Sequence, residues 1–288
     1  MLYLFLSIFG SVSVGVLFKF AKNYSVDILQ MVILNYIVTA SLSYFIFNVD
    51  IKNIPANLPY NTVITLGILL PLLFIIQYRS ILNSGIIKTD IAQRMSLFIP
   101  ILAAIFLFKE NISLLRYFAL ALGLLSVYFI INKKNIESNR LSKSQSIYPL
   151  LVFLGFGIID IYFKKLALYS FIPYTSSLFY VFFLAFTISI LYYFINRLIR
   201  KQKLFLINKY SLSFGLLLGA LNLINILFYM KAHQEFASNP TTVFAGMNFG
   251  VIILGTLIGY FGFQESLSKR NLLGLVFACI SIGLILYF

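Results

Sequence analysis

Three basic residues, Lys19, Arg94 and Lys164, lie inside long apolar segments of the chain. A charged side chain in the middle of a bilayer costs at least about 2.5–3.5 kcal/mol, so such a residue usually faces a polar pathway or another charge. In a pathway it would attract an anionic group on a small solute, and we predict that Arg94 and Lys19 bind a substrate carboxylate. The alternative for each lysine is a place near its helix end, from which the long side chain reaches the interface.

Two of these basic residues follow an acidic residue by four positions, which puts both on one helix face. Asp160 precedes Lys164, and because this pair can neutralise itself, a structural role is predicted for Asp160. Asp90 precedes Arg94, and Gln93 lies beside it. Arg94 and Gln93 therefore either bind a substrate or belong to a stabilising pair at the membrane rim.

Amide side chains inside the apolar segments have two interpretations. Asn222 and Asn225 are three residues apart, so they can face one neighbouring helix, and Asn35 and Asn248 also lie within apolar runs. A buried amide serves either a hydrogen bond between helices or a substrate. The candidate substrate-binding residues are therefore Lys19, Asn35, Gln93, Arg94, Lys164, Asn222, Asn225 and Asn248.

Two glutamates, Glu110 and Glu265, end apolar runs at corresponding points of the chain, and a serine follows each by three residues. Ser113 and Ser268 are placed to cap the next helix, and a glutamate in the same turn can interact with the positive end of that helix. We therefore predict structural roles for both glutamates, with proton coupling as the alternative. His233, the only histidine, is predicted to lie at the membrane rim, with the same alternative.

The composition excludes an ordinary soluble domain. Hydrophobic residues make up 61% of the 288 residues and charged residues only 10%, whereas soluble chains contain about 25% charged residues. The net charge of +14 does not indicate nucleic-acid binding, because the basic residues fall mostly in short breaks between apolar runs, where they contact lipid headgroups. We predict a multi-pass protein of the cell membrane (inner or plasma membrane) with membrane lipid, and no nucleic acid, as a partner.

The apolar runs predict helices, each near the roughly 20 residues needed to cross the hydrocarbon core, because the runs are too long and too continuously apolar for barrel strands. The fold class is all-α integral membrane, with ten transmembrane helices as two inverted five-helix repeats. The first repeat is 1–132, a polar basic linker is 133–147, and the second repeat is 148–288. The predicted spans are 2–21, 28–47, 62–83, 91–108, 114–131, 148–166, 175–195, 212–231, 241–263 and 271–287.

An internal repeat supports this division. Residues 96–130 match 251–285 at an offset of 155, and residues 3–25 match 148–170 at an offset of 145. Because each half has an odd number of spans, the second half enters from the opposite side, so the space between the halves lies near the midplane. Identical pairs include Lys19/Lys164, Phe108/Phe263, Glu110/Glu265 and Ser113/Ser268.

Small and helix-breaking residues recur in the spans. Pro100 lies in the span of the first half that corresponds to the span of Gly255 and Gly259 in the second half. The four-residue spacing of Gly255 and Gly259, repeated at Gly215 and Gly219, permits close approach of helix backbones. We predict structural roles for Pro100, Gly255 and Gly259.

With these motifs, essentially the whole chain resembles the EamA family of the drug/metabolite transporter superfamily. The late lysine in the first span of each half also fits that pattern, whereas Phe9-Gly10 stands where the family often has Trp-Gly, and the chain has no Trp. Recognition by a stacked indole is therefore not expected. The matching motifs are Pro100…Phe108-Lys109-Glu110-Asn111-Ile112-Ser113 and Gly255…Phe263-Gln264-Glu265-Ser266-Leu267-Ser268.

The resemblance implies a secondary transporter of small organic metabolites such as amino acids, working by alternating access and in the direction of export. The sequence has no phosphate-binding loop, no metal-ligand cluster and no nucleophile–base set. We therefore expect no enzyme activity, no cofactor and no metal, and a monomer. A membrane-embedded lipid-modifying enzyme and a non-transporting scaffold are the alternatives.

Two arguments about orientation oppose each other. Connections on the side of both termini carry five basic residues and those on the other side carry 13. The positive-inside rule then predicts termini outside the cell. The family resemblance implies cytoplasmic termini instead.

Overall fold

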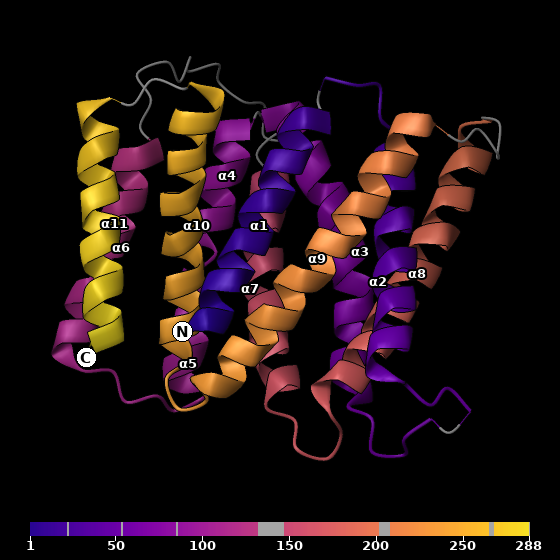
Figure 1. Cartoon of the computed structure of the whole chain (residues 1–288), viewed down its shortest axis with the longest axis horizontal. Coiled ribbons are helices and arrows are strands. Elements are labelled where there is room, and N and C mark those ends of the chain that lie inside the picture. The colour runs from indigo at the N-terminus through magenta and orange to yellow at the C-terminus, as the bar shows by residue number, and fades with distance from the viewer. Residues whose placement is uncertain are drawn as a thin grey trace.

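The computed structural model describes residues 1–21, 23–52, 54–84, 86–131, 147–201, 208–264 and 268–287. Within these residues the chain forms eleven α-helices and no strand (Figure 1). The helices are α1 (Leu2–Ala21), α2 (Ile28–Phe47), α3 (Tyr60–Ser84), α4 (Ile86–Met95), α5 (Phe98–Phe106), α6 (Leu114–Ile131), α7 (Ile147–Ala167), α8 (Tyr174–Ile199), α9 (Lys209–Glu235), α10 (Pro240–Phe263) and α11 (Lys269–Tyr287).

Seven helices are long and apolar enough to cross a membrane: α1, α2, α3, α8, α9, α10 and α11. Shorter apolar helical stretches cover Ala92–Phe106 and Leu114–Phe129, and α7 has 21 residues of which several are charged. Large apolar side chains such as Phe118 and Leu191 are exposed on the outer faces of helices, an arrangement that suits contact with lipid. The chain is a multi-pass membrane protein.

Nine of the predicted spans correspond to one helix each, with bounds that agree within four residues. The prediction of one continuous span over 91–108 is wrong, because α4 and α5 are separated by a turn at Ser96 and Leu97. Pro100 explains the break, since it has no N–H to donate to the carbonyl of Ser96. That carbonyl accepts instead from the N–H of Ile99 at 3.0 Å. The predicted linker lies outside the described residues except for Ile147, where α7 begins.

Successive spans alternate in direction, so the connections gather at two ends of the bundle (Figure 1). The first residue of the chain and the end of α11 lie at one of them, at the bottom of Figure 1, which we call the terminal end. α6 ends and α7 begins at the opposite end, which we call the linker end.

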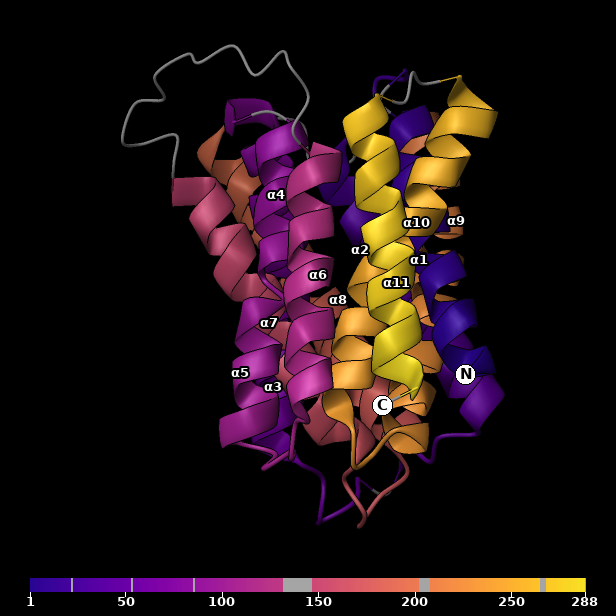
Figure 2. The same cartoon turned by 90° about the vertical axis from the view of Figure 1, so that its left-hand side faces the viewer.

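The contacts between helices join the first part of the chain to the second. α1 packs against α9 and α10, whereas α7 packs against α3, α4 and α5. α2 packs against α8, and α6 lies along α11 (Figure 2). The close approach of α9 to α2 agrees with the glycine spacing, because a Cβ atom on Gly219 would lie 2.8 Å from the carbonyl oxygen of Asn35. The predicted close packing at Gly255 is wrong, since nothing lies within 4 Å of its Cβ position; Gly259 is buried.

Packing differs between the two ends of the bundle. α10 starts at the terminal end, and eleven of its twelve buried residues lie within 240–252. Beyond that stretch only Gly259 is buried. On α1, Gly15 lies in the linker-end half, is exposed, and has nothing within 4 Å of its Cβ position. The packing along α10 is therefore dense at the terminal end and looser at the linker end.

Candidate functional site

Four polar residues follow one face of α9, at spacings of three, four and four residues: Asn222, Asn225, Tyr229 and His233. We call them the α9 polar stripe. α9 runs diagonally across the bundle (Figure 1) and packs against α1, α2, α7 and α10. The stripe thus leads from the middle of the bundle to the terminal end. Polar groups in this setting usually mark a solute or ion pathway, or join helices.

The two asparagines of the stripe contact two different helices. The Asn222 amide donates to Oδ1 of Asn35 on α2 at 3.1 Å. The hydroxyl of Ser7 on α1 lies 3.0 Å from Asn225 Oδ1 and 3.1 Å from the Asn225 carbonyl oxygen. Within the described residues, the buried Nδ2 of Asn35 has no hydrogen-bond partner. The amides therefore join helices, and one donor is left over near the middle of the bundle.

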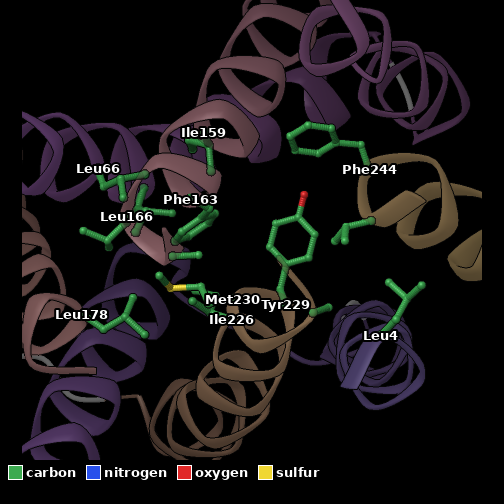
Figure 3. Packing of buried hydrophobic residues seen from close by; sticks show 14 of the residues in the cluster. Leu4, Leu66, Ile159, Phe163, Leu166, Leu178, Ile226, Tyr229, Met230 and Phe244 are labelled. Carbon is green, nitrogen blue, oxygen red and sulfur yellow. The ribbon is translucent and has the colours of Figure 1, made fainter. Parts of the chain in front are cut away.

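Tyr229 connects the stripe to α7. Its hydroxyl donates to Oδ1 of Asp160 at 3.0 Å, and its ring lies among apolar side chains that include Phe163 and Phe244 (Figure 3). Asp160 is half-buried. The predicted Asp160–Lys164 pair is wrong: both residues are described, no ion pair joins them, and Lys164 bonds elsewhere.

His233 is fully buried within the bundle, two residues before α9 ends, so its place at the membrane rim stays a prediction. α9 continues to Glu235, and its last turns are covered by α7 and α10. The imidazole stands between the rings of Tyr229 and Phe244, with centroids at 4.6 and 4.9 Å. Among the described residues neither ring nitrogen has a hydrogen-bond partner.

Lys164 is fully buried close to the terminal end, instead of reaching the interface. Its ammonium donates to the carbonyl of Ala237 at 2.8 Å and to that of His233 at 3.4 Å. Carbonyls at the C-terminal end of a helix carry partial negative charge, which stabilises a cation there. The Nζ atom also lies 6.0 Å from the ring centroid of Phe108. Lys164 thereby ties α7 to the α9–α10 connection.

A buried ion pair lies at the same end. Arg116 Nη1 is 3.2 Å from Glu110 Oε1 and 3.0 Å from Asn239 Oδ1. The Thr241 N–H donates to Glu110 Oε2 at 3.0 Å, and the Thr241 hydroxyl donates to Oε1. Glu110 therefore holds the N-terminus of α10. The sequence predicted that Glu110 interacts with the N-terminus of the next helix, α6, instead. Ser113 caps α6, because its hydroxyl accepts from the N–H of Arg116 at 3.3 Å.

The corresponding turn at the linker end is only partly described. Glu265 lies outside the described residues, whereas Ser268 caps α11 by accepting from the N–H of Asn271 at 3.2 Å. Lys19 is exposed there, with Nζ 3.6 Å from the ring centroid of Phe263. Lys19 and Lys164 thus lie at opposite ends of the bundle.

The remaining predicted residues do not join one site. Gln93 accepts from the Gln77 amide at 3.0 Å, and Asn248 donates to the carbonyl of Phe244 in its own helix. Arg94 is half-buried on α4, which packs against α3, α6 and α7, whereas Lys19 is on α1, which packs against α9 and α10. The described residues hold no group of three or more His, Cys, Asp or Glu side chains that could bind a metal ion.

Sequence reasoning missed three contributors: Tyr229, Arg116 and Thr241. The spacing of Asn222, Asn225, Tyr229 and His233 on one helix face was a usable signal for the tyrosine. Arg116 is only six residues from Glu110, whereas no local signal existed for Thr241, because it is 131 residues from Glu110 in sequence.

No family model matches the chain. A crystal structure of a protein with 10% sequence identity has a TM-score of 0.72 to this chain and covers 99% of it and 97% of the other chain. At that identity the likeness shows a shared fold alone. An uncharacterized protein of Haemophilus influenzae (strain ATCC 51907 / DSM 11121 / KW20 / Rd) is 38% identical over 292 residues, which cover 99% of this chain and 97% of the relative. The chain belongs to the family of this H. influenzae protein.

Proposed function

We propose that the protein is a secondary transporter of the EamA type, within the drug/metabolite transporter superfamily, that exports small organic metabolites such as amino acids across the cell (inner or plasma) membrane. It works by alternating access between two inverted five-helix repeats, α1–α6 and α7–α11, with α4 and α5 together counted as one span. The solute pathway lies between the repeats.

The contacts between helices support the inverted repeats. In the two repeats α1 corresponds to α7, and α3 corresponds to α9. Replacing each helix by its counterpart turns the contact of α1 with α9 into that of α7 with α3, and both contacts are present. The same exchange turns α1–α10 into the contact of α7 with α4 and α5. Two further contacts join a helix to its own counterpart: α2 packs against α8, and α6 packs against α11. Two halves related by a two-fold axis would pack in this way.

The observation that carries the proposal is a pair of lysine–phenylalanine contacts that differ in burial. Lys164 lies over Phe108 at the terminal end, and Lys19 lies over Phe263 at the linker end. All four residues belong to the identical pairs of the internal repeat. Lys164 is fully buried and Lys19 is exposed. One structural unit, present twice, is closed at one end of the membrane and open at the other.

A transporter in a state that is closed at one end and open at the other would show this difference in burial between Lys164 and Lys19. The Glu110–Arg116 pair and Lys164 close the terminal end, and we expect solutes to enter or leave at the linker end, where Gly15 and Lys19 are exposed. The turn at Ser96 and Leu97 makes the fourth span discontinuous, as in the broken helices of many transporters. We expect the cycle to exchange the roles of the two ends.

The test is solute counterflow by purified protein in liposomes. Vesicles loaded with one unlabelled solute receive the same labelled solute outside, drawn in turn from amino acids, organic acids and nucleosides. The proposal expects transient accumulation of at least one class, absent from empty liposomes. No counterflow for any class would contradict transport of these metabolites.

A second measurement tests alternating access directly. Cys279 is the only cysteine, so single cysteines can be introduced after Cys279→Ser. We expect Gly15→Cys at the linker end to react with a water-soluble maleimide, and Ala245→Cys, fully buried at the terminal end, to be protected. A transported solute should shift the two rates in opposite directions. Equal shifts in one direction would contradict the mechanism.

A further inference from the structure

Asp160 has no cationic partner within the described residues, unlike two other carboxylates of the bundle. Asp27 pairs with Arg197 and Glu110 pairs with Arg116. Asp160 accepts a hydrogen bond from the neutral hydroxyl of Tyr229. It lies on α7 one turn from the buried Lys164. An ionised carboxylate at such a depth is unfavourable unless something neutralises it.

The titratable groups around Asp160 do not supply that charge. α9 contributes Tyr229 and, behind its ring, the buried His233. On α7 itself, the ammonium of Lys164 is engaged by the carbonyls of Ala237 and His233.

The basic groups on α4 and α3 lie farther toward the linker end. Gly157 of α7 faces Ile99 of α5, so Arg94 is displaced from Asp160 by roughly 12 Å along the axis at 1.5 Å per residue. Arg79 of α3 donates to the hydroxyl of Tyr192 on α8. The described parts of α5 and α10 carry no charged side chain.

We propose that Asp160 is a proton-binding site that couples solute transport to a proton gradient. In the observed arrangement one carboxyl oxygen carries the proton, taken from water at the linker end, and Tyr229 donates to the other. The coupling rests on the proposed transport function, whereas proton binding at Asp160 does not.

The surroundings fit a proton better than a metal ion. A hard metal ion takes about six or more oxygen ligands. Within the described residues the hydrogen bond to Asp160 comes from the hydroxyl of Tyr229, whose ring lies among apolar side chains that include Phe163 and Phe244 (Figure 3). A proton needs no coordination shell, and it removes the charge.

Lys164 provides the release step. It follows Asp160 by four residues, so the two share a helix face. In the observed arrangement Lys164 is held by carbonyls of the α9–α10 connection. When the terminal end opens, those carbonyls move away and the ammonium can pair with Asp160. The O–H bond then breaks, the carboxylate is stabilised by the ammonium, and the proton leaves to water at the terminal end.

Infrared spectroscopy of the protein in liposomes tests proton binding without any solute. The wild type should show the C=O stretching band of a protonated carboxyl group, which disappears as pH is raised. Asp160→Asn should remove that band, whereas the matched Glu110→Gln should keep it, because Glu110 is ion-paired. Tyr229→Phe should keep the band and shift it to higher frequency, since one hydrogen bond to the carboxyl group is lost. A band unchanged in Asp160→Asn, or absent from the wild type at all pH values, overturns the proposal.

Transport by the same liposomes tests the coupling, using an amino acid that shows counterflow. With one proton per solute, a gradient of one pH unit should support up to about tenfold accumulation by the wild type. Asp160→Asn should lose this accumulation and keep counterflow, and Lys164→Met should lose it while keeping the infrared band. Accumulation that requires sodium and ignores the pH gradient overturns proton coupling. Absence of wild-type counterflow would instead contradict the transport function and leave the infrared result standing.

Discussion

Lys19 and Lys164 occupy equivalent positions in the predicted internal repeat, yet they lie in opposite environments. Lys164 is 0% exposed and donates to two backbone carbonyls, whereas Lys19 is exposed and lies over the aromatic face of Phe263. The same residue type at the same place in the repeat has therefore been given two environments. In the proposed transport cycle, the state of a helix end, as well as its sequence, decides what a repeated residue does.

The ion pairs at the two ends differ in the same sense. At the terminal end the side chains of Arg116 and Glu110 are 9% and 1% exposed. At the linker end those of Arg197 and Asp27 are 15% and 25% exposed. A buried pair is costly to break because either partner alone is an uncompensated charge, whereas a solvated pair contributes little. The terminal end is thus held by interactions that depend strongly on each other.

The largest expected effect comes from Arg116→Leu, which leaves Glu110 buried without its cation. Removing one partner of a buried pair costs about 3–5 kcal/mol. We expect a marked loss of thermal stability in detergent, together with faster maleimide labelling of Ala245→Cys at the terminal end. Arg116→Lys, which keeps the charge, should lose less. If Arg116→Leu left both measurements unchanged, the ion pair would not close this end.

The second prediction compares the two repeated lysines. Lys164→Met should destabilise the protein by about 1–3 kcal/mol, because the carbonyls of Ala237 and His233 lose a charged donor in a buried place. Lys19→Met removes an exposed contact with Phe263 and should cost about 0.5–1 kcal/mol or less. Thermal unfolding of both variants under one condition measures the difference. Equal losses would mean that the two ends are equally closed.

Much of the helical layout was predictable, because an apolar run of suitable length is a local property of the sequence. The bounds of α1, α2 and α6 agree with the predictions residue for residue. The break before Pro100 was missed although the proline was noted, because its effect falls one turn earlier, at the carbonyl of Ser96.

The candidate site was predicted less well, for a physical reason. Contacts such as Glu110 with Thr241 depend on how distant helices pack, and nothing in a single helix reports them. The burial of His233 was not anticipated, because being near a helix end does not exclude burial by neighbouring helices. Asp160 and Lys164 were correctly placed on one helix face but were assigned to each other, whereas each bonds to a group on or next to α9.

The third prediction uses glycines to compare packing in the first helix of each half. A Cβ on Gly157 of α7 would lie 2.5 Å from the Cβ of Ile99, an atom that cannot rotate away. Gly157→Ala should therefore cost about 1–3 kcal/mol through overpacking. Gly15→Ala on α1 meets nothing within 4 Å, so the better helix propensity of alanine should make it neutral or stabilising by up to about 1 kcal/mol. Thermal unfolding checks both, and a destabilising Gly15→Ala would indicate a packed linker end.

The smallest effect is expected for Arg197→Leu at the linker end. Asp27 keeps its second role after this change, because its side chain still accepts from the N–H of Leu29 and caps α2. The pair is partly solvated, so its loss should cost about 0–1 kcal/mol. Salt screens solvated charges and hardly affects buried ones, so the Arg197→Leu effect should shrink as ionic strength rises, while that of Arg116→Leu persists. If Arg197→Leu instead destabilised the protein as much as Arg116→Leu does, and independently of salt, Asp27 and Arg197 would already close the linker end. The bundle would then be closed at both ends, which is an occluded state.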